Sequence, residues 1–361
     1  MAICSNRSWT TLCGLKHAFT RAFTLAMALL IAQSAFARET LRVMTWPGYA
    51  DADLVKAFEA KTGSKVEVTT IDSDDVMWQK LNKNSANDFD VIAANTAELQ
   101  RYIQAGLVVP VNVANIPNTA KQLPRFRNLK GINGLVHGDK AFGIPYTYSE
   151  MGIIYDKQQV RSAPTSISAL WDPRYRGKVL LYNSASHNFS LAAMAKGDST
   201  PYQIKTAEWP ALVDQLISLR RNAQGFYAQP EESVEMFKSG HTALMFANYG
   251  SQQFKMLKEA GIDIGYTVPQ EGTTAWLDCW AVTRGAKNTQ LAEAWINHML
   301  EATAGETLLA RQGLANTTSE SPYLRSQDRL LWLEPVENAD RRTSLWERIL
   351  AGDRAGKVLA P

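Results

Sequence analysis

The chain has 361 residues, enough for two domains, with 38 lysines and arginines against 35 acids. Three of the basic residues and none of the acids lie in the first 37 residues, so residues 38–361 are neutral. A neutral chain without a basic stripe gives no sign of binding nucleic acid or a membrane surface.

Residues 1–37 have the pattern of a secretory signal peptide. A basic start precedes a short apolar run from Ala22 to Ala32, and Ala35-Phe36-Ala37 is an A-x-A cleavage site. Because no twin arginine occurs there, we expect Sec export, cleavage after Ala37 and a periplasmic protein. Cys279 is then the one cysteine left, which excludes an internal disulfide.

Strand and helix patterns alternate after the signal peptide. We predict strands at 40–46, 66–71 and 89–94, with helices between them and a further helix at 96–105. Repeated strand–helix–strand units favour a parallel sheet with helices on both faces.

The alternation breaks at residues 143–148 and resumes with a strand at Ile153. The later part predicts strands at 178–182, 243–246 and 262–268, and helices at 189–195, 209–221, 231–239, 251–260, 288–300 and 344–350. Two α/β lobes with the chain passing between them indicate a hinged cleft, which is where such folds take ligands.

Residues 276–282 form a further predicted strand with an unusual face. Trp276, Asp278 and Trp280 point the same way because side chains alternate along a strand. A carboxylate between two indoles suits an organic cation, since the carboxylate pairs with the ammonium and the rings add cation–π attraction. Alternatively, this is a core strand whose Asp278 accepts backbone hydrogen bonds, and the strand alone does not decide between the two.

Motifs of catalysis are missing from the sequence. It contains no G-x-S-x-G, H-E-x-x-H, P-loop or G-x-G-x-x-G motif in a fitting context. The histidines after the signal peptide have no spacing typical of metal ligands. We therefore expect no catalytic residues, no metal and no cofactor.

Several motifs together resemble the periplasmic substrate-binding proteins of ABC transporters, specifically the spermidine/putrescine-binding group. The resemblance spans most of the chain after the signal peptide and rests on residues 44–49, 89–92, 143–146, 170–178, 268–272 and 276–278. The most specific of these are the Leu-Trp-Asp-Pro-x-Tyr-x-Gly-Lys run at 170–178 and the Trp-x-Asp at 276–278.

The resemblance implies a two-lobed, type II-like periplasmic binding protein fold, in which each lobe is a mostly parallel sheet flanked by helices and the ligand lies in a hinged cleft. We expect residues 38–149 and 278–330 to form lobe one, and residues 150–277 and 331–361 to form lobe two. The implied partners are a small amine and an inner-membrane ABC permease, and we expect a monomer that binds no nucleic acid.

Four residues match the family's ligand site. Asp278 and Trp276 match its cation contacts, and Trp46 and Tyr49 match aromatic residues at the cleft mouth. Other positions depart from the pattern, because polar or small residues replace acids, aromatics and one hydroxyl residue: Gly48, Asn95, Ala97, Ser184, His187 and Asn248. We still expect Asn95, Ser184, His187 and Asn248 to line the cleft.

The missing acids bear on the ligand's charge. A polyamine has an ammonium at each end, and a buried ammonium without a carboxylate loses about 3–5 kcal/mol, or two to three decades of affinity. With Asp278 as the remaining family acid, the cleft is expected to suit one ammonium. Glu150, near the predicted hinge, would supply a second carboxylate or else be a solvated hinge residue. His187, if protonated, would favour an anionic far end of the ligand.

Asp72, Asp74 and Asp75 form an acidic group at the predicted start of a helix, for which Ser73 or Asp74 is the expected N-cap. Acids at that position usually cap the helix and complement its dipole, and we interpret them so. The alternative to an amine-binding protein is an anion or ferric-ion receptor on the same scaffold, in which Asp278 is structural.

Overall fold

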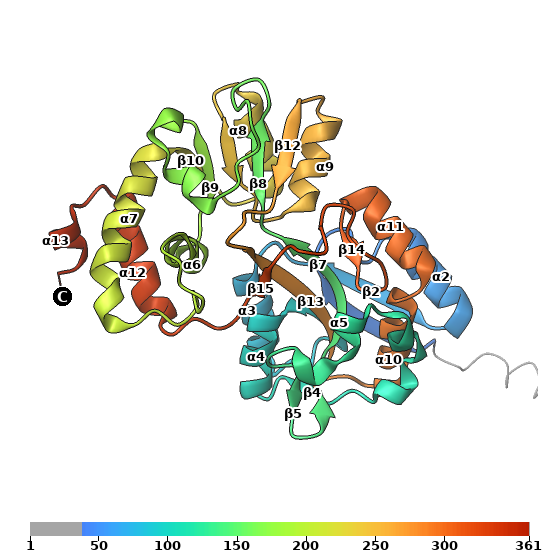
Figure 1. The fold of residues 1–361 in the computed structure, drawn as a ribbon. Helices are drawn as coiled ribbons and strands as arrows, with labels where there is room; N and C mark the ends of the chain where they lie inside the picture. The colour runs from blue at the N-terminus through green and yellow to red at the C-terminus, as the bar shows by residue number, and fades with distance from the viewer. Residues whose placement is uncertain (1–37, 361) are drawn as a thin grey trace, which may run out of the picture.

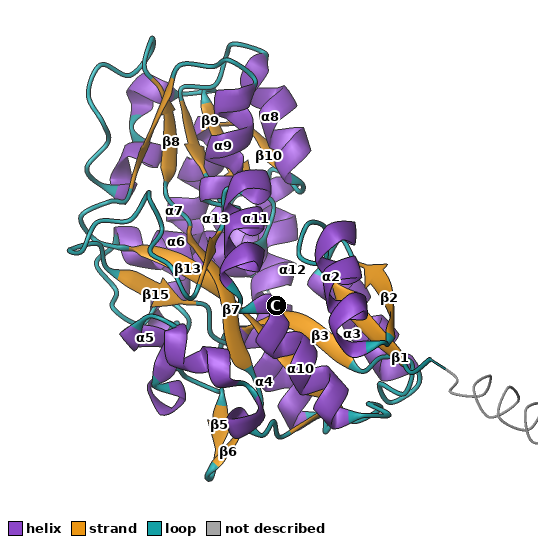
Figure 2. Ribbon diagram, turned by 90° about the vertical axis from the view of Figure 1, so that its right-hand side faces the viewer, coloured by secondary structure: helices purple, strands orange, loops and turns teal. Residues whose placement is uncertain are grey.

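The computed structural model describes residues 38–360, and the predicted signal peptide with its cleavage site lies outside this range. The chain folds into two α/β lobes that are joined by segments passing between them (Figure 1). Figure 2, turned by 90°, shows lobe two above lobe one, with β7 and β13 near their junction.

Lobe one is built on an eight-stranded sheet. Its main path runs β14-β7-β13-β3-β1-β2, and β15 and β4 pair with β13. The strands are β1 Thr40–Thr45, β2 Lys65–Thr70, β3 Val91–Asn95, β4 Val108–Val109, β7 Ile144–Glu150, β13 Thr273–Thr283, β14 Ala315–Asn316 and β15 Leu330–Trp332.

The directions of these strands differ in part from the expectation. β1 pairs in parallel with both β2 and β3, as the strand–helix alternation predicts. β13, however, is antiparallel to both β3 and β7, so the sheet is mixed where a mostly parallel one was expected. The reason is that β13 returns from lobe two and enters at the edge where β3 and β7 end.

The helices of lobe one cover both faces of the sheet (Figure 1). They are α2 Ala52–Thr62, α3 Asp74–Lys83, α4 Thr96–Gln104, α5 Pro124–Arg127, α10 Thr289–Met299 and α11 Ala302–Gln312, with 3₁₀ turns at Val113–Asn115, Pro117–Lys121 and Leu129–Gly131. A small hairpin joins β5 Val136–His137 to β6 Lys140–Ala141.

Lobe two has a five-stranded sheet in the order β10-β9-β11-β8-β12, which is also mixed. Its strands are β8 Ile153–Asp156, β9 Val179–Tyr182, β10 Ala223–Tyr227, β11 Leu244–Phe246 and β12 Ile264–Thr267. Its helices are α6 Ala185–Ala195, α7 Trp209–Asn222, α8 Pro230–Lys238, α9 Ser251–Glu259, α12 Ala339–Leu350 and α13 Ala355–Val358, with 3₁₀ turns at Ile167–Trp171, Pro173–Tyr175 and Thr206–Glu208.

The chain passes between the lobes three times. The first passage lies between β7 and β8, the second between β12 and β13, and the third between β15 and α12, which packs on α6 and α7. Because β13 begins at Thr273, Trp276 and Leu277 belong to the sheet of lobe one and not, as expected, to lobe two.

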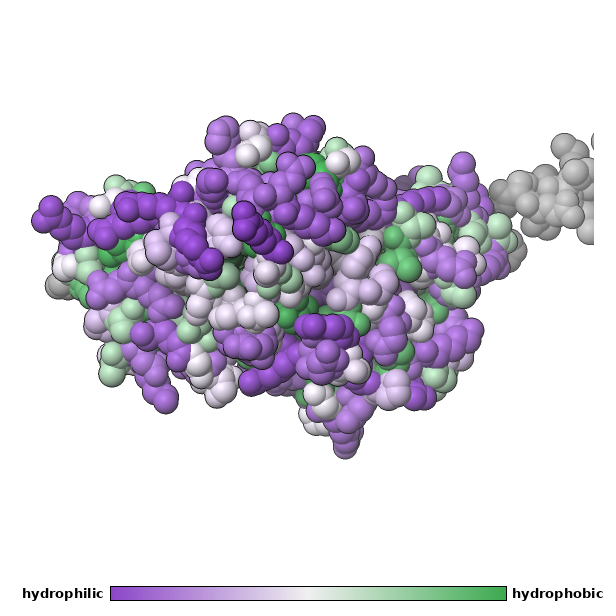
Figure 3. Space-filling model, turned by 45° about the horizontal axis from the view of Figure 1, so that its top comes forward, coloured by the Kyte–Doolittle hydropathy of each residue, from purple (hydrophilic) through white to green (hydrophobic). Residues whose placement is uncertain are grey.

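The hydrophobic side chains lie between the sheets and their helices. Val68 is the one large hydrophobic residue that is exposed within the described part of the chain, and the face in Figure 3 is mostly hydrophilic with small scattered hydrophobic groups. Within residues 38–360, no helix combines the length and apolar composition that crossing a membrane requires.

Candidate functional site

Polar side chains gather at the edge of the lobe-one sheet that faces lobe two. Asp278 on β13 lies directly opposite Asn95, the last residue of β3, and directly paired residues point to the same face. Thr45 ends the neighbouring β1, and the pairing of Val43 with Val91 puts Thr45 on that face as well. Carboxyl ends of strands at a lobe boundary are where α/β proteins place ligands.

Asp278 is the most buried acid of this group. Asp278 is 7% exposed, and Tyr49 Oη donates a 2.7 Å hydrogen bond to its Oδ2. Burial raises the pKa of Asp278 to about 7, and the Tyr49 hydrogen bond opposes only part of that rise. No lysine, arginine or histidine forms an ion pair with Asp278 among the residues described, so a cation from outside would stabilise its charged form.

Aromatic rings surround this carboxylate. Tyr49 packs edge-on against Tyr146, with ring centroids 5.3 Å apart, and Tyr146 in turn contacts Trp280 at 5.3 Å. Trp276 is half-buried between the cores of the two lobes, and its indole N–H donates to the backbone oxygen of Asn248 at 3.2 Å. The half-buried Trp46 follows Thr45 directly.

Asn95 joins this site to α3, which the sequence did not lead us to expect. Its Oδ1 caps α4 by accepting the backbone N–H groups of Ala97 and Glu98, both at 3.0 Å. Its Nδ2 donates to Oδ1 and Oδ2 of Asp74 at 3.1 and 3.2 Å. The Asn95 amide is therefore engaged by protein groups on both sides, and it holds a second carboxylate next to Asp278.

Of the two N-cap candidates of α3, Asp74 is not the cap, although Asp74 and Asp75 lie in the first turn as expected. Ser73 is the N-cap, because its Oγ accepts the backbone N–H of Val76, and Asp72 and Asp75 are exposed. Burial, with repulsion from Glu98, Asp278 and Asp75, raises the pKa of Asp74 well above its ordinary value. Because Ser73 takes the cap, the carboxylate of Asp74 is left to accept hydrogen bonds from Asn95.

Lobe two contributes rings, an amide and an imidazole. Tyr182 contacts Tyr249 with a centroid distance of 5.8 Å and an interplanar angle of 82°. Burial is the main cause that raises the pKa of each tyrosine. Tyr249 Oη donates to the backbone oxygen of the residue before Gln229 at 2.7 Å, and Gln229 Nε2 donates to the backbone oxygen of Asp72 at 3.5 Å, so this pair of rings lies where lobe two meets the start of α3. Asn248 is 7% exposed, and its Oδ1 has no hydrogen-bond partner in the range 38–360.

Ser184 and His187 are hydrogen-bonded to each other. Ser184 caps α6, and its Oγ lies 2.8 Å from Nδ1 of His187. Burial and the nearby Arg342 lower the pKa of His187 to about 4. The imidazole is therefore neutral at pH 7 and offers no positive charge to an anionic ligand.

Glu150 is not brought together with Asp278. It pairs with Ala275, three positions before Asp278 on β13, and side chains at odd spacing point to opposite faces. It is fully buried, its two carboxylate oxygens lack partners in the described structure, and burial raises its pKa to about 7. Glu150 is thus a buried hinge residue. We expected it either to contact the ligand or to be a solvated hinge residue, and the structure shows neither.

Contacts between the lobes close the structure around the site. Gln252 Nε2 donates to Gln312 Oε1 at 3.1 Å, and the hydroxyls of Ser149 and Ser251 lie 3.2 Å apart. Both pairs join lobe one to lobe two, and together with the Trp276–Asn248 hydrogen bond they explain why Asp278 is nearly inaccessible.

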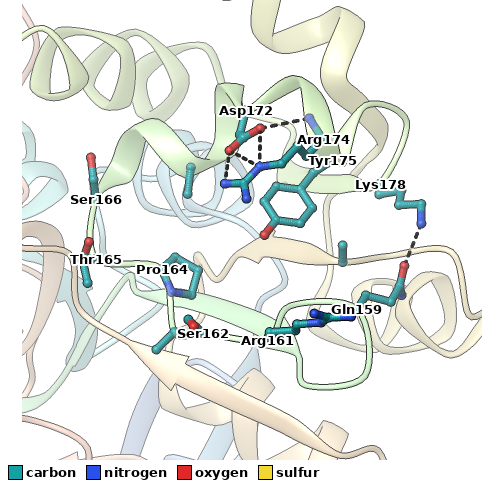
Figure 4. A pocket seen from close by; sticks show the side chains of 13 residues that line it. Gln159, Arg161, Ser162, Pro164, Thr165, Ser166, Asp172, Arg174, Tyr175 and Lys178 are labelled. Carbon is teal, nitrogen blue, oxygen red and sulfur yellow. Dashed lines mark hydrogen bonds and ion pairs between the residues drawn. The ribbon is translucent and has the colours of Figure 1, made fainter.

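Two surface hollows lie away from this site. One, of about 520 Å³, is lined by lobe-two residues only, and in it Arg174 pairs with Asp172 and Lys178 donates to Gln159 (Figure 4). The other, of about 360 Å³, is lined partly by Trp332 and Leu333. Neither is lined by Asp278 or Asp74.

Comparison with known proteins identifies similar chains. The family model of the bacterial extracellular solute-binding proteins matches residues 53–326. Spermidine/putrescine-binding periplasmic protein 1 of Haemophilus influenzae is 25% identical over 294 residues, which cover 80% of this chain and 78% of that protein. The putrescine-binding periplasmic protein PotF of Escherichia coli is 25% identical over 290 residues, covering 76% of each chain.

Solved structures agree on the fold. The spermidine/putrescine ABC transporter substrate-binding protein PotD from Streptococcus pneumoniae superposes with a TM-score of 0.69 at 22% identity, covering 89% of this chain and 99% of that one. The expected two-lobed periplasmic binding protein fold is thereby confirmed.

Proposed function

This chain belongs to the bacterial extracellular solute-binding proteins, and on that premise we propose that its cleft captures a small organic amine for import. The names of its relatives refer to spermidine and putrescine, which makes these two amines the first ligands to test. We assign the chain no catalysis.

The observation that carries the proposal is the state of Asp278. It is a buried carboxylate without a cation partner among the described residues, with one hydrogen bond from Tyr49 and with aromatic rings around it. Burying a charge without a partner is unfavourable, and an ammonium ligand removes that penalty while the rings add cation–π attraction.

The remaining site residues differ in what they contribute to ligand binding in this proposal. Trp276, Trp46 and Tyr49 form the aromatic walls on the side of lobe one. Asn248 and Ser184 offer polar contacts from lobe two, and His187 acts as a neutral ring. Asn95 acts indirectly, because its amide already binds Asp74 and caps α4.

Closure of the lobes is the expected response to the ligand. Groups from both lobes meet only when the cleft is closed, so an amine that contacts both shifts the open–closed equilibrium towards the closed form. We further propose Sec export with cleavage after Ala37, a periplasmic location, a monomeric state and delivery to the permease of an ABC importer.

The test compares ligand classes and one substitution. Thermal-shift screening of putrescine, spermidine, small anions and ferric ion identifies the ligand class, because a tight ligand raises the melting temperature by mass action. In calorimetry, Asp278→Asn should weaken amine binding by about 100-fold or more.

The matched control is Asp139→Asn, which removes an acid from an exposed hairpin turn paired with Lys130. It should bind like the parent protein. Unchanged amine affinity in Asp278→Asn would sink the proposal, as would stabilisation by an anion or ferric ion without any response to amines.

A further inference from the structure

Two carboxylates flank a single amide at the cleft. Asp278 and Asn95 are cross-strand partners, whose Cβ atoms lie about 5 Å apart in such a pair. The Asn95 amide then contacts both oxygens of Asp74 within 3.2 Å. An ionised carboxylate has about four lone-pair sites, so each carboxylate keeps acceptor capacity for a further donor.

Neither carboxylate has a basic partner. Asp74 and Asp278 form no ion pair with any residue between 38 and 360, and the charged groups that most affect Asp74 are Glu98, Asp278 and Asp75, all acids. Arg101 pairs with Glu98 at 3.5 Å, and its guanidinium stacks over Trp78. Asp74 and Asp278 therefore lie at this edge of the sheet without a cation to neutralise them in the described structure.

Buried oxygens at the same edge also lack donors. Thr45 Oγ1 is fully buried at the end of β1, on the face that carries Asp278, and Asn248 Oδ1 is buried in lobe two, on the residue whose backbone oxygen accepts from Trp276. Both are without hydrogen-bond partners in the described chain. These acceptors are independent of the acidic pair, and a ligand rich in N–H groups would satisfy them.

Within residues 38–360, no acid of lobe two is hydrogen-bonded to Asp74, Asn95 or Asp278. The rings of Tyr182 and Tyr249 lie where lobe two meets the start of α3, because Gln229, next to the hydrogen-bond partner of Tyr249, donates to the backbone oxygen of Asp72 at 3.5 Å. His187 lies against Tyr182, and the cation behind it, Arg342, is already paired with Glu337 at 2.6 Å. Both carboxylates thus come from lobe one, and lobe two closes over them with aromatic faces that favour cations.

From this arrangement we infer that Asp74 binds a second cationic nitrogen of the ligand, so that the cleft selects an organic dication over a monocation of the same length. The inference rests on the proposed amine-binding function and assigns it a second carboxylate. It replaces the expectation of a cleft suited to one ammonium.

Selectivity between two amines of equal chain length tests the inference. Calorimetry measures the affinities of 1,4-diaminobutane and of butylamine for the parent protein and for Asp74→Asn. The parent should prefer the diamine by about 100-fold, and Asp74→Asn should lose about that factor for the diamine while changing butylamine binding by less than about 3-fold.

Asp75→Asn is the matched control, because Asp75 is the next residue of α3, carries the same charge and is exposed. It should retain the preference for the diamine. Asp74→Asn should also melt no lower than the parent, since it removes repulsion among acids, and this separates lost recognition from lost folding.

The outcomes separate the two proposals. Diamine binding by Asp74→Asn at the parent's affinity, with Asp278→Asn inactive towards both amines, overturns the inference and leaves the proposed function standing. A parent protein that prefers butylamine, or binds both amines equally, overturns the inference as well. Failure of both amines to bind the parent overturns the proposed function together with the inference.

Discussion

Tyr49 donates a 2.7 Å hydrogen bond to Asp278, a residue 229 positions later in the chain. The bond links the loop after β1 to the strand that returns from lobe two. It also keeps one oxygen of a buried carboxylate hydrogen-bonded when no ligand is present, and so it prepares the ionised form of Asp278 for an amine.

Tyr49→Phe tests whether the Tyr49 hydrogen bond prepares ionised Asp278 for an amine. A hydrogen bond to a charged group contributes about 1.5–3 kcal/mol, so amine affinity should fall by roughly 10-fold or more at pH 7. Tyr146→Phe is the control, because Tyr146 packs on Tyr49 but its own hydroxyl is unpartnered in the described structure. Equal affinities of the two variants in calorimetry would contradict the assigned role of Tyr49.

Amine affinity should depend on pH. Burial raises the pKa of Asp278 to about 7 in the empty cleft, although the Tyr49 hydrogen bond opposes part of the rise. Burial and the neighbouring acids raise the pKa of Asp74 as well. The amine binds the ionised carboxylates, so affinity should rise as pH increases through 7, and binding at pH 7 should release protons. Calorimetry in two buffers of different ionisation enthalpy measures that release, and buffer-independent heats would argue against it.

Glu150 should make the empty protein less stable as pH rises. Its pKa is about 7 in the folded state and near 4.5 when unfolded, so the folded state binds the extra proton between these values. This extra proton stabilises the folded state at low pH by about 3 kcal/mol for a pKa shift of this size. The stabilisation is lost as pH rises through 7.

Glu150→Gln should therefore flatten the stability profile between pH 5.5 and 8.5 in urea unfolding. Glu306→Gln, at an exposed position on α11, is the control and should keep the parent's slope. A Glu150 variant with the same slope as the control would show that Glu150 does not titrate in this range.

Gly250 lies where lobe two touches the hinge. Its φ is +56°, and a Cβ there would come within 2.2 Å of Ser149 Oγ and of the backbone oxygen of Glu150. Gly250→Ala should therefore reduce the free energy of unfolding by more than about 2 kcal/mol. Gly261→Ala shares the positive φ, at +78°, but meets nothing within 4 Å, so it should lose only about 1 kcal/mol. Equal losses in urea unfolding would contradict the close approach at the hinge.

Much of the fold could be predicted from local patterns. The alternation of Trp276, Asp278 and Trp280 identified the central strand β13 and the face on which its carboxylate lies. The strand–helix units identified β1 to β3 and α2 to α4. β10 was missed, since its residues are mostly half-buried at a sheet edge and show no clear period.

The residues of the candidate ligand site also differ in whether the sequence could identify them. The sequence by itself determined that Trp276, Asp278 and Trp280 share one face of a strand, because a period of two is a local property of a strand. Only the tertiary structure decided which second carboxylate joins Asp278. Glu150 was the closer candidate by its position at the hinge, yet pairing with Ala275 turns it to the opposite face. Asp74 reaches the site through Asn95, 21 residues later, because Ser73 caps α3 in its place. Strand register sets the direction of Glu150 and depends on a partner far away in the chain. The start of α3 is set locally by Ser73, but the residue that Asp74 then meets lies on another strand.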